Sequence, residues 1–221
     1  MSTLDHVDVS RPSPFSILVW SAVVALEVAL VGIYVTVANV DVGLFHLYPF
    51  VWINVGVWAV ARTTPTGGTR RQKSIAGAVA VGYFLVLAAV GGLFATSLFT
   101  SDWHAHGLRL EATLPPGYGP ALFYSGSWLL VSLVPYQLVG YLSLAYLVYV
   151  TVLDAARSAA GGVVGLFACV SCAWPILASL TTGTAGAGTA VATAVYAQAY
   201  ELSTVAFVLT VALLYWRPLA R

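Results

Sequence analysis

Residues 161–182 read GGVVGLFACVSCAWPILASLTT, an uncharged apolar run that contains both cysteines of the chain, Cys169 and Cys172. About 20 apolar residues in an α-helix are enough to cross the roughly 30 Å hydrocarbon core of a bilayer. This segment therefore predicts a membrane-spanning helix with a thiol pair inside it, and it sets the fold class expected for the rest of the chain.

The composition of the whole chain agrees with a lipid environment. Of the 221 residues, 60% are hydrophobic and 8% are charged, whereas about 25% of the residues in an ordinary soluble domain are charged. The net charge is +1 and the basic residues are scattered over short loops, so no basic surface for nucleic acid is expected. We expect one integral membrane domain with the lipid bilayer as its partner.

Hydropathy predicts an all-α bundle of about six transmembrane helices. The apolar segments lie at residues 15–39, 43–61, 75–98, 133–153, 161–182 and 191–216. We expect residues 99–120 to form the one long outer loop, and residues 121–130 to form a helix at the outer interface or an outward extension of the fourth span. Residues 1–14 and 217–221 are expected as tails, and the first span as a retained anchor, because residues 1–14 lack the basic start of a secretory signal.

The distribution of basic residues predicts the orientation of this bundle. Six spans place both termini on the same side of the membrane, and every basic residue except Arg109 then falls on that side. An excess of lysine and arginine in short loops marks the cytoplasmic side. We therefore expect a multi-pass protein of the cell membrane with both termini in the cytoplasm.

Cys169 and Cys172 share one face of the predicted helix, because positions i and i+3 are neighbours on a helix. Such a pair can form a disulfide, exchange with another thiol pair or bind a soft metal such as copper(I). The alternative interpretation is packing, because cysteine behaves as a small hydrophobic residue and a thiol in apolar surroundings is a poor nucleophile. Both interpretations stay open at the level of sequence.

Polar side chains within the spans form a second group of candidates. Glu27 lies near the middle of the first span, where an unpaired carboxylate is costly, so we expect it to be protonated or paired. An acid at this depth is typical of proton or ion movement, and a neutral acid that donates a hydrogen bond to a neighbouring helix explains it equally well. The other candidates for a shared polar cavity are Tyr136, Gln137, Gln198 and Glu201.

Histidines and carboxylates in the outer connections form a third group. The candidates for metal binding are His46, Asp102, His104 and His106. Imidazole and carboxylate groups are the ligands of zinc, copper and nickel sites. Ordinary solvated or interfacial histidines are the alternative interpretation, because His-x-His in a loop occurs readily by chance.

Three stretches carry a resemblance to known sequences: PYQLVGYLSLAYLVY at residues 135–149, ACVSCAWPILASL at residues 168–180 and LLYWRP at residues 213–218. They resemble an uncharacterised family of multi-pass membrane proteins of halophilic archaea, which implies no activity. A looser likeness is to the cytochrome c biogenesis thiol-transfer membrane family, a six-span bundle with membrane-embedded cysteines near prolines. That family carries its reactive cysteines on two different helices, whereas Cys169 and Cys172 lie in one segment.

Three functions follow from these candidates. The first is the handling of thiol redox or a soft metal ion such as copper through Cys169 and Cys172. The second is a non-catalytic accessory or assembly subunit of a membrane respiratory or copper enzyme complex, with other membrane subunits as partners. The third is a small proton- or ion-coupled transporter that uses Glu27 and Glu201. The sequence has no Ser-His-Asp pattern and no phosphate-binding loop, so hydrolases and nucleotide-dependent enzymes are not expected.

Overall fold

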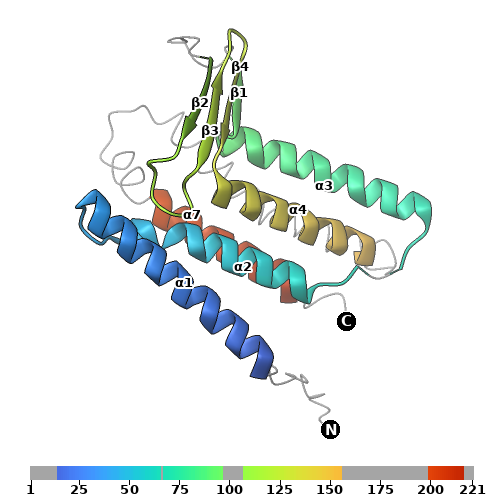
Figure 1. The fold of residues 1–221 in the computed structure, drawn as a ribbon. Helices are drawn as coiled ribbons and strands as arrows, with labels where there is room; N and C mark the ends of the chain where they lie inside the picture. Colours follow the sequence, from blue (N-terminus) through green and yellow to red (C-terminus); the bar gives the residue numbers. More distant parts are fainter. Residues whose placement is uncertain (1–13, 66, 97–106, 156–198, 217–221) are drawn as a thin grey trace. The chain divides into compact units, whose positions relative to one another are not determined.

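The structure is a computed structural model that describes residues 14–65, 67–96, 107–155 and 199–216 (Figure 1). The chain divides into two compact units, Met1–Val42 and Gly43–Arg221. The first unit contains one helix, and the second contains the remaining described helices together with a β-sheet. Each unit is described by itself.

The first unit is the helix α1, which spans Pro14–Ala38. Proline at its first position costs no hydrogen bond, because the first N–H groups of a helix have no intrahelical partner. Asn39 ends the helix with a φ of 52°, a left-handed conformation that asparagine tolerates. The side chains of α1 are mostly apolar and exposed, which is typical of a helix whose surroundings are lipid or other apolar helices.

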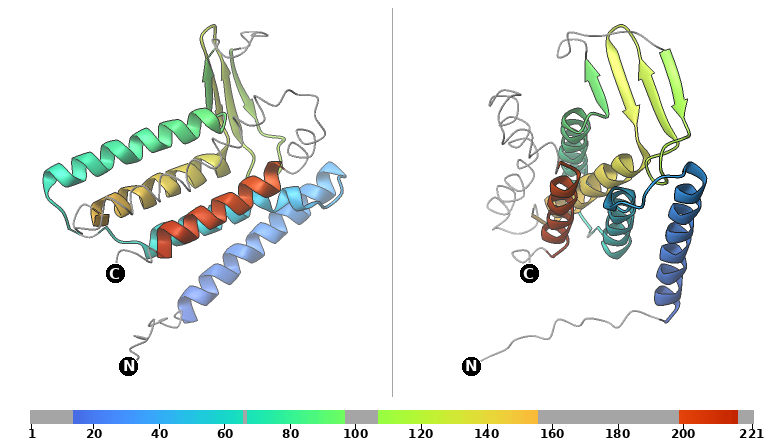
Figure 2. Two further views of the ribbon diagram at one scale, coloured as in Figure 1. Left: turned by 180° about the vertical axis from the view of Figure 1, so that it is seen from behind. Right: turned by 90° about the vertical axis from the view of Figure 1, so that its left-hand side faces the viewer.

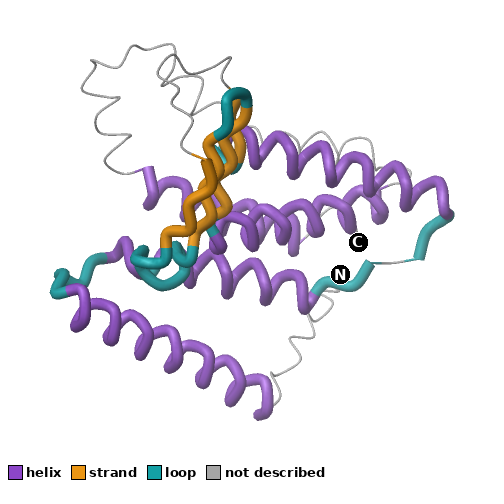
Figure 3. Tube along the Cα trace, turned by 45° about the horizontal axis from the view of Figure 1, so that its top comes forward, coloured by secondary structure: helices purple, strands orange, loops and turns teal. Residues whose placement is uncertain are grey.

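The helices of the second unit pack around one central helix, α4. The bounds of its elements are η1 Leu44–His46, α2 Tyr48–Arg62, α3 Arg70–Val90, α4 Pro135–Ala155 and α7 Ala199–Trp216. α4 contacts α2, α3 and α7, and more than half of its span is buried. Figures 1 and 3 show these four helices side by side. α4 is therefore the element on which the other described helices of the unit are assembled.

A polar turn separates α2 from α3 and gathers basic residues at one end of the unit. Thr69 caps α3: its hydroxyl accepts from the Gln72 amide at 3.3 Å, and the Gln72 side chain accepts from the Thr69 amide at 2.9 Å. This reciprocal pair satisfies two amides that would otherwise have no helical partner. The basic residues at this end are Arg62, Arg70, Arg71 and Lys73.

A four-stranded antiparallel sheet lies at the opposite end of these helices (Figures 1 and 3). Its strands are β1 Phe94–Thr96, β2 Gly107–Glu111, β3 Ala121–Ser125 and β4 Leu129–Leu133, in the order β1-β4-β3-β2. β1 follows directly after α3, and β4 leads directly into α4. The sheet is therefore connected to the helical unit at the end of α3 and at the start of the central helix α4.

The sheet corrects the predicted fold class and the prediction for two segments, residues 121–130 and residues 99–120. The predicted all-α class is wrong because the unit contains a β-sheet as well as helices. Residues 121–130 form β3 and the start of β4 instead of an interfacial helix. β2 likewise lies inside the predicted outer loop 99–120. The physical reason is that Gly126 interrupts the apolar run with a turn, closed by a 2.9 Å hydrogen bond from the Gly126 amide to the Leu129 carbonyl, which hydropathy does not reveal.

The helical predictions agree with the structure at a coarser level. The described residues contain four helices that are long and apolar enough to cross a membrane: Pro14–Ala38, Leu44–Arg62, Arg70–Val90 and Pro135–Ala155. α7 is also apolar but shorter. The predicted fifth span and both chain ends lie outside the described residues, so the number of six spans and the cytoplasmic termini stay predictions.

Glycines allow the helices of the second unit to approach closely. A Cβ atom added to Gly56 on α2 would lie 2.7 Å from the Ser143 Oγ on α4. At Gly140 on α4 an added Cβ would clash with the Trp52 ring, and at Gly91 after α3 it would clash with the Tyr141 hydroxyl. Small residues at helix contacts are the usual means of close packing in membrane bundles.

We predict that Gly140→Ala destabilises the second unit by about 1–3 kcal/mol, the usual cost of overpacking a core. Gly82→Ala in α3 is the matched control, because nothing lies within 4 Å of the added methyl group, and alanine favours a helix over glycine by roughly 1 kcal/mol. The measurement is the melting temperature of the purified protein in one detergent. Equal melting temperatures for the two variants would contradict the close approach of Trp52 to Gly140.

Candidate functional site

An aromatic cluster occupies the second unit where its helices meet the sheet. Trp52 of α2 stacks on Phe207 of α7, with ring centroids 4.2 Å apart and an interplanar angle of 8°. Tyr136 and Tyr141 of α4 meet the same indole edge-on, with centroids at 5.6 and 5.8 Å. All four rings are buried. Stacked and edge-to-face pairs each contribute about 0.5–1.5 kcal/mol beyond burial, so this cluster joins three helices firmly.

The polar edge of Trp52 is satisfied inside the bundle. Its Nε1–H donates to the Thr204 Oγ1 on α7 at 3.0 Å, and both groups are buried. Residues 52 and 204 are 152 positions apart. This bond therefore connects α2, near the start of the unit, to α7, its last described helix. An indole N–H buried without an acceptor would be costly. Thr204 therefore fixes the orientation of the ring as well as the distance between the helices.

Tyr118 extends the aromatic cluster to the loop between β2 and β3. Its ring stacks on Phe45 at 4.3 Å and meets Tyr136 edge-on at 4.9 Å, and its hydroxyl donates to the Phe45 carbonyl at 3.1 Å. Gly117 has a φ of 87°, and an added Cβ would clash with Pro49. The loop therefore enters the bundle only because position 117 is a glycine.

A polar pair lies at the first turns of α2 and α7. The Tyr48 hydroxyl lies near the Glu201 carboxylate and interacts with it electrostatically. Glu201 is exposed and lies in the first turn of α7, where a negative charge is favoured by the helix dipole. Of the polar residues predicted to share a cavity, Tyr136 is buried in the aromatic cluster, Gln137 is half-buried at the start of α4, and Gln198 lies outside the described residues. The structure thus brings Glu201 to Tyr48, a residue that the sequence did not single out.

His46 has a structural role in the short helix η1. Its side chain is buried, and its Nδ1 lies 3.3 Å from the Gly43 amide and 3.2 Å from the Gly43 carbonyl. Either tautomer makes a contact that closes the turn before α2. The ring nitrogen nearest the backbone is therefore occupied by the chain itself, which favours the structural interpretation of His46.

The remaining site candidates fall into two groups. Glu27 lies in α1 of the first unit and is half-buried there. Asp102, His104, His106, Cys169 and Cys172 lie outside the described residues. Within the described ranges, no group of three or more histidine, cysteine or acidic residues is placed to hold a metal ion. The predicted thiol and metal sites stay predictions.

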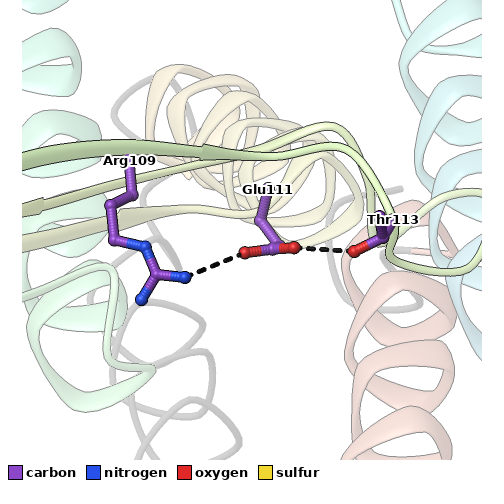
Figure 4. Close-up of polar contacts among 3 residues, drawn as sticks. All are labelled: Arg109, Glu111 and Thr113. Carbon is purple, nitrogen blue, oxygen red and sulfur yellow. Dashed lines mark hydrogen bonds and ion pairs between the residues drawn. The ribbon is translucent and has the colours of Figure 1, made fainter.

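Strand β2 carries an ion pair that the sequence analysis did not anticipate. The Arg109 Nη2 lies 3.3 Å from the Glu111 Oε2, and the Thr113 hydroxyl donates to the Glu111 Oε1 at 2.6 Å (Figure 4). Residues two apart in a strand point to the same face, so the strand itself places the two charges together. An exposed pair of this kind contributes little to stability, about 0–1 kcal/mol, and it marks the face of β2 that is directed to a polar environment.

The aromatic residues of the cluster were missed as a group because each is an ordinary lipid-facing or interfacial residue by composition. The only sequence signal was the occurrence of glycines, at positions 56, 117 and 140, on the segments that carry them. Glycines opposite large rings permit contacts that no other residue allows. Of the three, Gly140 lies against the Trp52 ring, whereas Gly56 lies against Ser143 and Gly117 against Pro49. Which residue each glycine meets depends on which segments are neighbours, and the sequence does not state that.

We predict that Thr204→Val costs about 1–3 kcal/mol, because it leaves the buried Trp52 N–H without an acceptor while keeping the side-chain volume. Thr210→Val on the same helix is the matched control: Thr210 is buried to the same degree and donates to the Ala206 carbonyl of its own helix at 2.7 Å. Unfolding in mixed detergent micelles, followed by circular dichroism, measures both. A loss at Thr210 equal to that at Thr204 would rule out a special role for the Trp52 bond.

The comparison with known proteins identifies a family and adds no activity. No curated protein and no solved structure matches the chain. A protein-family model matches residues 1–221, and it describes a family of unknown function, as expected from the sequence. The likeness to the thiol-transfer family stays a prediction. Across its whole length, the chain belongs to the family of unknown function DUF7546.

Proposed function

We propose that this chain is a multi-pass protein of the cell membrane that acts as a non-catalytic accessory or assembly subunit of a membrane complex. The observation that carries the proposal is the way in which the second unit is fixed: its helices touch through glycines, and its aromatic cluster joins α2, α4, α7 and the sheet loop. A rigid apolar body of this kind suits a protein that positions other subunits.

The buried hydroxyl groups of the helices support the same proposal. Ser143, Thr151 and Thr210 each donate to a carbonyl of their own helix four residues earlier, at 2.8, 2.8 and 2.7 Å. A transport path needs polar side chains that face a hydrated cavity or the substrate. These three hydroxyl groups are directed to the backbone instead, so they favour a static bundle over a path for an ion.

The orientation is part of this proposal. The basic residues at the turn between α2 and α3 lie at one end of the helices, and the sheet lies at the other. Because lysine and arginine in short loops concentrate on the cytoplasmic side, the sheet lies on the outer side of the membrane. Arg109, the one basic residue expected outside, is on this sheet.

We predict that loss of the protein lowers the amount of an assembled membrane complex, and that the variant Cys169→Ser with Cys172→Ser restores it fully. The measurement is quantitative native-gel analysis of solubilised membranes from cells that lack the protein, complemented with either form. The variant Thr204→Val, which weakens the bundle, should restore the complex less well. A normal amount of the complex in cells that lack the protein would contradict the proposal. A serine variant that does not restore the complex, while the unchanged protein does, would also contradict it.

A second candidate function is thiol redox or soft-metal handling, and the spacing of Cys169 and Cys172 in one apolar segment favours it. If the pair acts in this way, acid-trapped alkylation in native membranes should label the two thiols only after a reductant, for a disulfide, or only after a copper(I) chelator, for bound metal. Intact mass counts the labelled thiols. Two thiols that react equally under all conditions would exclude this function and leave the accessory subunit.

A further inference from the structure

The sheet has two chemically different faces. Side chains alternate along each strand, and the register places Leu108 beside Tyr124, and Tyr124 beside Val131, which pairs with Phe94. We call this the apolar face; its members are Phe94, Leu108, Leu110, Leu122, Tyr124, Leu129, Val131 and Leu133. The opposite face carries Arg109, Glu111, Ser125 and Ser132, together with Ala121, Phe123 and Leu130.

Among the described residues, the apolar face is exposed on β2 and beside the turn between β3 and β4. Leu108 and Leu110 are 67% and 68% exposed, and Tyr124 and Leu129 are also exposed. Trp128, in the turn between β3 and β4, is 78% exposed. Contiguous exposed apolar side chains of this size are rare on a surface that meets only water, so this face requires an apolar environment.

The position of the sheet indicates which environment it is. Phe94, at the base of the apolar face, packs against the buried core of the helices, and Ala121, at the base of the opposite face, is fully buried. The apolar face therefore adjoins the helices at its base. Figure 2 shows that the sheet stands across the helix ends and extends beyond α3. The helix α3 has exposed apolar side chains, including Val79, Val86 and Val90, and it leads along the chain into β1. The apolar face therefore continues a surface that is itself expected to contact lipid.

We propose that the apolar face of the sheet, with Trp128 at its tip, rests on the outer leaflet of the membrane as an interfacial element beside α3, an inference that rests on the membrane orientation proposed above. Tryptophan and tyrosine are the residues enriched at the boundary between headgroups and acyl chains, and leucines next to them enter the upper acyl region. Arg109 and Glu111 on the opposite face then point to water. The partner is the lipid bilayer itself, and the contact lies outside the helical spans.

The test uses p-benzoylphenylalanine, a photo-crosslinking residue, in place of Leu110 or, as the matched control, in place of Arg109. The two positions are adjacent in β2 and equally exposed to a probe, but they point to opposite faces. The full-length protein is irradiated in native membranes, purified, and its intact mass is measured. A lipid adduct adds the mass of one phospholipid, whereas an adduct with protein gives a crosslinked dimer or an internal crosslink without added mass.

We expect at least about tenfold more lipid adduct at position 110 than at position 109, because only the apolar face reaches the acyl boundary. The same probe in place of Trp128 should also give lipid adducts. Equal lipid adducts at 109 and 110 would overturn the proposal. It would also be overturned by crosslinks at 110 to a second copy or to another segment of the chain, or by the absence of any adduct at 110.

Discussion

The contact of Trp52 with Gly140 is the constraint on which the second unit depends. The indole contacts Phe207 and Thr204 on α7, and the absence of a side chain at position 140 lets α4 lie directly against the same ring. One large ring thereby fixes three helices at once. In a membrane, where lipid is as apolar as leucine, such packing and one buried hydrogen bond are the main forces that select one arrangement of helices over another.

The loop between β2 and β3 transmits this arrangement to the sheet. Tyr118 stacks on Phe45 and contacts Tyr136, which is itself part of the ring cluster around Trp52. The Tyr136 amide also donates to the Gly117 carbonyl at 3.3 Å. The sheet is thus connected to the helices by the chain at β1 and β4 and, in addition, by side chains that are already fixed in the core. A displacement of α2 relative to α4 would therefore also move the loop between β2 and β3 and the sheet.

The sequence predicted those features that depend on local composition. Residues 14–38 and 135–155 form helices because an apolar run in lipid must satisfy its own backbone hydrogen bonds. β3 and β4 are equally apolar, and their backbone partners lie in residues 94–96 and 107–111, so the choice of strand depends on contacts distant in sequence. The Glu201 contact with Tyr48 and the Trp52 bond to Thr204 were unpredictable for the same reason, since each joins segments about 150 residues apart.

The backbone of the sheet agrees with the proposed position at the interface and not with a position within the bilayer. In the part of the chain that the structure describes, β2 is an edge strand that pairs only with β3, so half of its N–H and C=O groups need water or headgroups as partners. Unpaired backbone groups are not tolerated in the hydrocarbon region. The exposed apolar side chains of the sheet need an apolar environment, whereas its open edge needs hydrogen-bond partners. A position flat on the outer leaflet satisfies both needs. The side chains of Leu108 and Leu110 then face the acyl boundary, and the strand edge stays among polar groups.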